Sequence, residues 1–308
     1  MTTAPHQSPI RRSRCHAWVR YVLLLGLLPP GGPILSTPKA LAEPLDAAGY
    51  TERCAQRNRD QDWKGAVADC SEAVRLNPAL VDAWLDRCWA RVGVGEADKA
   101  VADCREGLRL DPANSRGYII QGYMKTEGLQ DYRGALADYN KAIALNPDVV
   151  PYHEMGNARM GLKEYKAAID DFTKAIEADS DFKAHSQLRR GDAKAALQDY
   201  QGAIADYDQV IALDPKNYLA YFNRAMARSD LNNHREDIAD YDKAIQLDST
   251  DAMAYHNRGL SKLELKDLNG AIADYTKAIE LKPENADFFF ARGYALDEIK
   301  DYRGAIAD

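Results

Sequence analysis

The sequence has few of the residues on which catalytic and metal sites depend. It contains six histidines in 308 residues, and it has no glycine-rich phosphate loop and no GxSxG motif. The histidines beyond residue 42 are His153, His185, His234 and His256. A metal site needs three or four converging ligands. The sequence therefore predicts a protein that is not an enzyme and that binds no metal and no cofactor.

Long apolar runs are also missing. The apolar run Tyr21–Leu28 near the start is too short to cross a bilayer as a helix, which takes about 20 residues. A basic stretch precedes this run, and Ala40-Leu41-Ala42 follows it as a small-x-small cleavage site. This order is typical of a signal peptide. We therefore expect a signal peptide over residues 1–42, a short leader over 43–46, and no integral membrane span.

Two alternatives to a cleaved signal peptide stay open. The stretch from Leu28 to Ala42 is long and rich in proline and glycine, so the segment could remain uncleaved. Arg11-Arg12 also leaves open a twin-arginine signal. With cleavage, the mature protein is expected in the bacterial periplasm or outside the cell.

The mature chain is poor in positive charge. Residues 1–42 hold five basic residues and no acidic one, so residues 43–308 hold 35 basic and 47 acidic residues, a net charge of −12. Such a surface repels nucleic-acid phosphates and anionic lipid. We therefore expect a protein or peptide partner, with apolar and basic side chains favoured, and no nucleic acid.

Cysteine is scarce, and its distribution agrees with export. With Cys15 in the predicted signal peptide, four cysteines remain within 51 residues: Cys54, Cys70, Cys88 and Cys104. In an oxidising compartment such cysteines are more often disulfide-bonded than free nucleophiles. Their pairing depends on the internal repeat of the chain.

One short segment recurs along the sequence. GAIADYTKAIELKP at 270–283 has near copies, GALADYNKAIALNP at 134, GAIADYDQVIALDP at 202 and GAVADCSEAVRLNP at 65. The Asp of the Ala-Asp pair recurs every 33 to 35 residues, at Asp69, Asp103, Asp138, Asp171, Asp206, Asp240, Asp274 and Asp308. A period of this length indicates an array of structural repeats.

Each repeat contains two helix-forming stretches. In the recurring segment, Ala271 and Tyr275 fall on one helical face and Ile272 and Ile279 on another, and a proline then ends the helix. A second helical stretch precedes each copy. We expect a repeat domain over 47–308, in which eight helix-turn-helix repeats start at residues 47, 81, 115, 149, 184, 218, 252 and 286. The eighth stops inside its second helix, so we expect the protein to continue beyond the end of this sequence.

The repeats resemble the tetratricopeptide repeat, which has aromatic and small residues at fixed positions. Counted from the first residue of each repeat, position 4 holds Tyr50, Trp84, Tyr118, Tyr152, Gln187, Tyr221, Tyr255 and Phe289. Position 8 holds Cys54, Cys88, Gly122, Gly156, Gly191, Ala225, Gly259 and Gly293. Seven of the eight repeats have an alanine late in the turn region, and repeat 6 has Asp237 there instead. Four residues after this position the repeats have an aromatic residue, but repeats 1 and 2 have Cys70 and Cys104. A proline closes most repeats, and Ser180 and Ser249 are the exceptions.

The resemblance covers residues 47–308 and implies an all-α fold. That fold is a right-handed superhelical solenoid of antiparallel helix pairs, in which the first helix of each repeat lines a concave wall. Small residues let the two helices approach closely, and the aromatic fills the gap between one hairpin and the next. No hairpin can bury its second face alone, so the copies bury one another.

The cysteines occupy positions 8 and 24 of repeats 1 and 2. In this family both positions face the seam between the two helices of a repeat. The favoured pairing is therefore Cys54 with Cys70 and Cys88 with Cys104. A Cys70–Cys88 link between repeats and four unpaired buried thiols are the alternatives.

Position 7 carries an arginine in six repeats, and position 23 of the same repeats holds the Asp of the Ala-Asp pair. The arginines are Arg53, Arg87, Arg190, Arg224, Arg258 and Arg292. Each arginine could form an ion pair with the aspartate on the other helix of its repeat, or the two charges could be solvated separately; the sequence leaves both possibilities open. A step of one residue rotates a helix by about 100°, so we expect that positions 7 with 23 and 8 with 24 do not both meet directly.

Positions 2, 5, 6, 9, 12 and 13 of the first helices are expected to face the concave wall in this family, and two apolar clusters occur there. Repeats 2 and 3 place Leu85, Trp89, Ile119, Ile120 and Tyr123 at these positions. Repeats 6 to 8 place Phe222, Met253, His256, Phe290 and Tyr294 there. Exposed aromatics gathered in a groove suggest binding anchors. Some of them can instead pack only between neighbouring repeats.

Polar side chains at position 6 accompany the clusters. Glu52, Asp86 and Glu154 are expected around the first cluster, where they favour a segment with apolar and basic side chains. Farther along, position 6 holds Arg189, Asn223 and Asn257, a polar ladder able to bond a peptide backbone. Asparagine is common at this position of the family whatever the repeats bind.

These features predict an exported protein–protein interaction scaffold that presents a concave groove to a peptide or helix of a partner protein. An alternative is a docking or regulatory array attached to a catalytic domain beyond residue 308. A third is an enzyme acting within the repeats. The sequence leaves the oligomeric state open.

Overall fold

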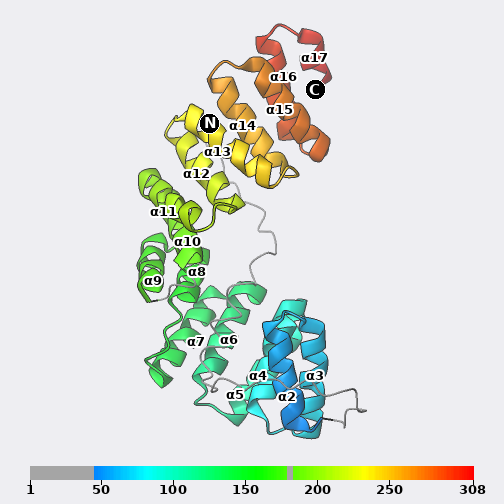
Figure 1. Cartoon of the computed structure of the whole chain (residues 1–308), viewed down its shortest axis with the longest axis vertical. Coiled ribbons are helices and arrows are strands. Elements are labelled where there is room, and N and C mark those ends of the chain that lie inside the picture. Colours follow the sequence, from blue (N-terminus) through cyan, green and yellow to red (C-terminus); the bar gives the residue numbers. More distant parts are fainter. Residues whose placement is uncertain (1–44, 179–182) are drawn as a thin grey trace, which may run out of the picture. The chain divides into compact units, whose positions relative to one another are not determined.

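The computed structural model describes residues 45–178 and 183–308, which form helices and no strand. The predicted signal peptide over 1–42 lies outside the described residues. The chain divides into two compact units, an N-terminal unit that ends at Glu164 and a C-terminal unit over Tyr165–Asp308. Both consist of helices packed in consecutive antiparallel pairs (Figure 1).

The N-terminal unit contains seven described α-helices and one π-helix. They are α2 (Ala47–Arg59), α3 (Trp63–Leu76), α4 (Val81–Val94), α5 (Ala97–Leu110), α6 (Ser115–Met124), the π-helix η1 (Lys125–Leu129), α7 (Tyr132–Leu145) and α8 (Tyr152–Gly161). The pairs α2 with α3, α4 with α5, and α6 with α7 are the two helices of repeats 1, 2 and 3.

The C-terminal unit continues the same alternation. Its helices among the described residues are α9 (Tyr165–Ala178), α10 (Lys183–Ala196), α11 (Tyr200–Leu213), α12 (Tyr218–Asp230), α13 (His234–Leu247), α14 (Ala252–Glu264), α15 (Leu268–Leu281), α16 (Ala286–Glu298) and α17 (Tyr302–Ala307). First helices α10, α12, α14 and α16 each pack against the second helix that follows.

An aspartate caps most of the second helices. Its carboxylate accepts a hydrogen bond of 3.0–3.1 Å from the N–H of the glycine three residues later, in the pairs Asp62–Gly65, Asp131–Gly134, Asp199–Gly202, Asp267–Gly270 and Asp301–Gly304. A Cβ added to Gly134 would lie 2.1 Å from the other oxygen of the capping carboxylate of Asp131. Any side chain there would displace the cap, which explains why the recurring segment opens with glycine.

A tyrosine packed against a glycine closes the seam between the two helices of a repeat. The buried rings of Tyr139, Tyr207 and Tyr275 lie over Gly122, Gly191 and Gly259, where an added Cβ would be 2.5–2.7 Å from the nearest ring carbon. Positions 8 and 24 therefore face each other across the seam.

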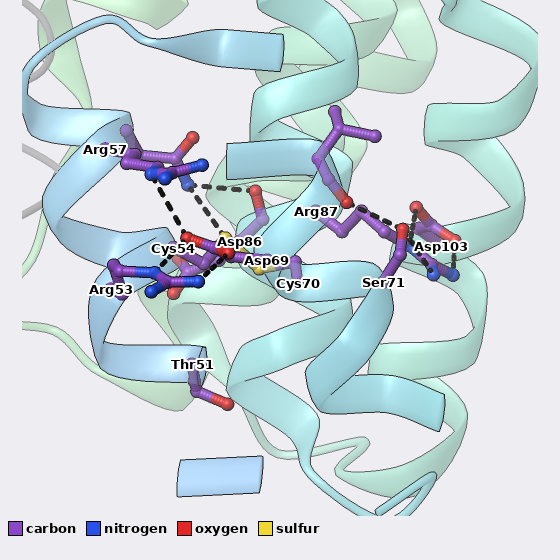
Figure 2. The surroundings of a disulfide bond; sticks show 12 residues. Thr51, Arg53, Cys54, Arg57, Asp69, Cys70, Ser71, Asp86, Arg87 and Asp103 are labelled. Atoms are coloured by element: carbon purple, nitrogen blue, oxygen red, sulfur yellow. Dashed lines mark hydrogen bonds and ion pairs between the residues drawn. A yellow bond between two sulfur atoms is a disulfide. The ribbon is translucent and has the colours of Figure 1, made fainter. Parts of the chain in front are cut away.

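In repeats 1 and 2 a disulfide replaces this glycine–tyrosine contact. Cys54 is bonded to Cys70 and Cys88 to Cys104, and the Cα atoms are 5.4 Å apart in both pairs. All four residues are fully buried, and Figure 2 shows the first bond between α2 and α3. The pairing favoured from the repeat positions is the one present.

The π-helix η1 absorbs an extra residue in repeat 3. The interval from Gly122 to Tyr139 is one residue longer than the matching interval from Gly259 to Tyr275. A π-helix holds more residues per turn than an α-helix. The turn over Lys125–Leu129 therefore takes up the surplus, and Tyr139 still meets its glycine.

The position-7 arginines bind the aspartates of the Ala-Asp pairs. Five of them donate two hydrogen bonds of 2.5–3.0 Å each, in the pairs Arg53–Asp69, Arg87–Asp103, Arg190–Asp206, Arg224–Asp240 and Arg258–Asp274. Arg292 and Asp308 form the sixth pair. The first five aspartates are at most 4% exposed, so these are structural ion pairs.

The expectation that positions 7 with 23 and 8 with 24 would not both meet is wrong. In repeat 1, Arg53 holds Asp69 while Cys54 is bonded to Cys70 directly beside it (Figure 2). The long, flexible arginine side chain reaches across the offset that one residue of helical rotation creates. A second cation, Arg57, lies 3.1 Å from the same carboxylate.

Candidate functional site

The apolar cluster predicted in repeats 2 and 3 is largely buried. Leu85, Ile119 and Ile120 are fully buried, and Trp89 is 7% exposed. The prediction that these four side chains line an open groove is therefore wrong. Tyr123 is half-buried.

Small residues on neighbouring helices explain the burial of Leu85. A Cβ added to Gly107 of α5 would lie 2.7 Å from the Leu85 side chain, and one added to Gly117 of α6 would lie 3.3 Å from it. Leu85 therefore fills the space that the two glycines leave between three helices. Leu85 is a core residue, and neighbouring helices rather than solvent surround it.

Aromatic packing accounts for Trp89. Its ring lies 4.9 Å from that of Tyr123 and 6.4 Å from that of Trp63, which meets it edge to face. The three rings come from α3, α4 and α6, so they tie consecutive helix pairs together.

The carboxylates expected around this cluster are not free to attract a cationic partner. Asp86 is 3% exposed and paired with Arg116 of the next repeat, and Glu154 is also 3% exposed. Glu52 is exposed. The sequence had suggested an acidic rim at this cluster, but two of its three members belong to the interior of the fold.

The predicted polar ladder is engaged within the fold. Arg189 lies 2.9 Å from one oxygen of Asp192, and the Asn223 amide donates a 2.8 Å hydrogen bond to the other. The Asn257 side chain bonds to Tyr241. All three ladder residues are partly exposed. The Arg189 contact lies within α10, whereas the two asparagine contacts join first helices to neighbouring helices.

The cluster predicted in repeats 6 to 8 divides into buried and exposed members. Phe222 is 8% exposed, and its ring packs edge to face on Tyr241 at 5.8 Å, so its assignment to an open groove is wrong. Phe290 is 79% exposed and Tyr294 51%. Met253 and His256 are half-buried.

Exposed apolar side chains form a row on the first helices of the C-terminal unit. Position 9 supplies Met226 on α12, Leu260 on α14 and Tyr294 on α16, and Leu219 and Phe290 add to them. We call these five residues the C-terminal apolar face. The sequence analysis missed Leu219, Met226 and Leu260, although all three occupy positions expected on the groove wall.

A hollow of 250 Å³ lies within this face. Its lining comes from α14, α15 and α16, and consists of His256, Leu260, Leu263, Tyr275, Asp287, Phe290, Ala291 and Tyr294. The centroid of the His256 ring lies 5.6 Å from that of Tyr275 and 5.0 Å from that of Phe288, and both contacts are tilted. The hollow is therefore an apolar depression with a carboxylate on its lining.

Among the described residues, no helix combines the length and apolar character that a membrane crossing requires. Over the same residues, no group of three or more histidine, cysteine or acidic side chains is arranged to hold a metal ion.

Comparison with family models supports the repeat assignment. A model described as "TPR repeat" matches residues 191–232 and 259–298, and one described as "Tetratricopeptide repeat" matches residues 151–182 and 218–251. No curated protein matches the sequence.

Solved structures share the fold. The crystal structure of the APC/C hetero-tetramer Cut9-Hcn1 matches with a TM-score of 0.65 and 17% identity over 81% of this chain and 49% of that one, so this chain spans about half its length. A tetratricopeptide repeat protein from Parabacteroides merdae matches with a TM-score of 0.57 and 19% identity, over 81% of this chain and 98% of that one. At these identities the likeness shows a common fold alone.

Proposed function

The chain belongs to the tetratricopeptide-repeat family, and from this premise we propose that it binds a peptide or helix of another protein on the C-terminal apolar face. The family makes the chain a protein-interaction scaffold built as an all-α solenoid. Our proposal adds where the partner binds. The C-terminal apolar face takes the place of the buried cluster of repeats 2 and 3 as the expected docking surface.

The exposure of the C-terminal apolar face carries this proposal. Leu260 and Tyr294, both at position 9, are 41% and 51% exposed, and together with Phe290 they line a hollow of 250 Å³. Folding removes apolar side chains from water wherever packing allows, and exposed aromatic residues beside a depression are the usual anchors of an interface. A partner that inserted a side chain into the hollow would bury these rings.

A peptide selection tests the proposal. A random-peptide phage library is panned on the whole protein, and the selected peptides are measured against a Phe290→Ala/Tyr294→Ala variant. We expect affinity to fall about tenfold or more, as for aromatic anchors of other interfaces. A Leu213→Ala/Leu247→Ala variant serves as control, because these leucines are also exposed but lie on second helices α11 and α13.

Two results would count against the docking face. The selected peptides could bind the Phe290→Ala/Tyr294→Ala variant as tightly as the unchanged protein. They could also lose affinity equally in both double variants, which would indicate general stickiness rather than a site.

We also propose that the protein is exported. Two fully buried disulfides fit an oxidising compartment better than a reducing one, and the sequence of residues 1–42 is typical of a signal peptide. Intact-mass measurement of the protein recovered from a bacterial host should give a chain that starts at Glu43. Recovery of an uncleaved chain with four free thiols would contradict this proposal.

A further inference from the structure

We propose that the segment bound on the C-terminal apolar face carries basic side chains next to its apolar ones. This inference rests on the proposed function and adds the chemistry of the partner. A row of carboxylates borders the exposed apolar row in repeats 6 to 8, and together the two rows select for a cationic, amphipathic segment.

The carboxylates occupy the same place in three consecutive repeats. Helices α12, α14 and α16 each end on an exposed acidic residue at position 13: Asp230, Glu264 and Glu298. Residues four apart lie on the same face of a helix. Each acid is therefore one turn beyond the exposed apolar residue at position 9, and each first helix presents an apolar group followed by a negative charge.

Helix stability does not explain this placement. The C-terminus of a helix carries partial negative charge, so a carboxylate at the last helical residue is unfavourable. Other first helices of the described chain avoid it, since α2, α4, α8 and α10 end on Arg59, Val94, Gly161 and Ala196. Acidic ends in consecutive repeats occur only where the chain carries the apolar face; Glu127, at position 13 of repeat 3, stands alone and lies in η1.

The cations on the same helices are already used elsewhere. Arg224 and Arg228 bind Asp240, Arg258 and Lys262 bind Asp274, and Arg292 binds Asp308. Within the described part of the chain, Glu264 and Glu298 form no ion pair, and Asp230 accepts a hydrogen bond from the Tyr200 hydroxyl.

Repeats 6 to 8 carry a negative net charge. Lys266 and Lys300 lie in the turns just beyond two of the acids. With these lysines included, residues 218–308 hold 17 acidic and 12 basic residues. A basic partner segment is therefore attracted to this part of the molecule, and an acidic one is repelled.

Lysine and arginine side chains fit the two rows together. Their apolar stems pack along apolar surface while their charged ends reach outward to a carboxylate. Asp287 adds a further carboxylate on the lining of the hollow. A neutral apolar segment would cover the face but would partly remove these carboxylates from water without a compensating charge.

Three matched peptides test the inference. Each has about 18 residues, or five helical turns, with leucine at the same positions and Lys, Gln or Glu at all other positions. Binding to the whole protein is measured by fluorescence anisotropy at about 0.05 M and about 0.5 M salt. We expect the Lys peptide to bind about tenfold more tightly than the Gln peptide at low salt, and the Glu peptide to bind more weakly than both.

Two triple variants with the same change in net charge locate the effect. Asp230→Asn/Glu264→Gln/Glu298→Gln should abolish the preference for Lys over Gln. Glu236→Gln/Glu280→Gln/Glu284→Gln removes exposed acids outside the face and should preserve it.

The outcomes separate this inference from the proposed function. Equal binding of the Lys and Gln peptides, lost in Phe290→Ala/Tyr294→Ala, would overturn the inference and keep the docking face. An equal loss of preference in both triple variants, or no binding by any peptide, would also overturn it. Binding of the Lys peptide that ignores Phe290→Ala/Tyr294→Ala would overturn the docking face itself.

Discussion

Single residues set how closely the two helices of a repeat approach. The contact between position 8 and position 24 recurs as glycine against tyrosine in repeats 5 and 7, and in repeat 3 with the tyrosine one position later; the rings are 0–1% exposed. A ring buried on all sides cannot move aside as a surface side chain can. A methyl group added at position 8 must therefore push the tyrosine ring away or force the two helices apart.

Gly259→Ala should destabilise the C-terminal unit. The new Cβ would lie 2.7 Å from the Tyr275 ring, too close for two carbon atoms, and relief of such overpacking usually lowers the free energy of unfolding by about 1–3 kcal/mol. Gly293→Ala at the same position of repeat 8 is the control, because its nearest neighbours would be 3.5 Å away. Urea denaturation followed by circular dichroism should show a lower midpoint for the first variant only; equal midpoints would refute the steric account.

Asp237 is a buried acid at a position where the other repeats have alanine. It is fully buried, and its carboxylate lies 3.2 Å from the Nδ1 atom of His234. Burial raises the pKa of Asp237, and the hydrogen bonds from Ser261 and His234 only partly oppose that rise. The folded state therefore disfavours the ionised carboxylate.

Asp237→Ala should stabilise the protein at neutral pH and have less effect in acid. An acid whose pKa is raised by folding destabilises the fold above that pKa, and the penalty disappears as pH falls through the raised value toward the ordinary 3.8. We expect a gain of about 1–3 kcal/mol in unfolding free energy at pH 7 that shrinks toward pH 4. Urea titrations across this range measure it, with Asp237→Asn as the variant that keeps the side-chain volume; a gain that is independent of pH would contradict the explanation.

At the scale of the elements, a disulfide joins the two helices of repeats 1 and 2 at the place where a tyrosine ring packs between the helices of later repeats. Cys54–Cys70 joins α2 to α3 and Cys88–Cys104 joins α4 to α5, at the positions that hold glycine and tyrosine elsewhere. Two cysteines fill less of the seam than a tyrosine. Without the bonds, these two repeats would have neither the cross-link nor the ring.

Reduction should therefore weaken the N-terminal unit selectively. Each bond closes a short loop and contributes roughly 3 kcal/mol by the chain-entropy estimate. Hydrogen exchange read by mass spectrometry should show faster exchange in α2 to α5 after dithiothreitol treatment, with α11 to α15 unchanged. A Cys54→Gly/Cys70→Tyr variant restores the contact of the later repeats, so α2 and α3 should become insensitive to reductant; uniform acceleration along the chain would argue against this assignment.

The π-helix should tolerate a deletion that an α-helix would not. Removal of Gly128 from η1 gives repeat 3 the same interval between its glycine and its tyrosine that repeats 5 and 7 have. We expect a melting temperature close to that of the unchanged protein, because the surplus residue is not needed for the Gly122–Tyr139 contact. Deletion of Lys262 within α14 is the control and should unfold its repeat; similar losses in both variants would show that η1 is required.

At the scale of the whole molecule, the helix pairs and disulfides followed from the sequence, but the exposure of the first-helix positions did not. The repeat period fixes which positions face the seam, so the Cys54–Cys70 pairing could be read from it. Burial at position 5 depends on side chains in other repeats. Leu85 is covered because its neighbours are glycines, and Asp86 is neutralised by Arg116 from the next repeat.

The same repeat position should therefore serve stability in one unit and binding in the other. Trp89 and Leu260 both occupy position 9 of internal repeats, yet Trp89 is 7% exposed and Leu260 is 41% exposed. Trp89→Ala should lower the free energy of unfolding by about 3–5 kcal/mol through the cavity it leaves, whereas Leu260→Ala should lower it by about 1 kcal/mol or less. Thermal unfolding and binding of the selected peptides, measured on both variants, should show opposite patterns. If Leu260→Ala were as destabilising as Trp89→Ala, Leu260 would be part of the core and the docking face would lose its main support.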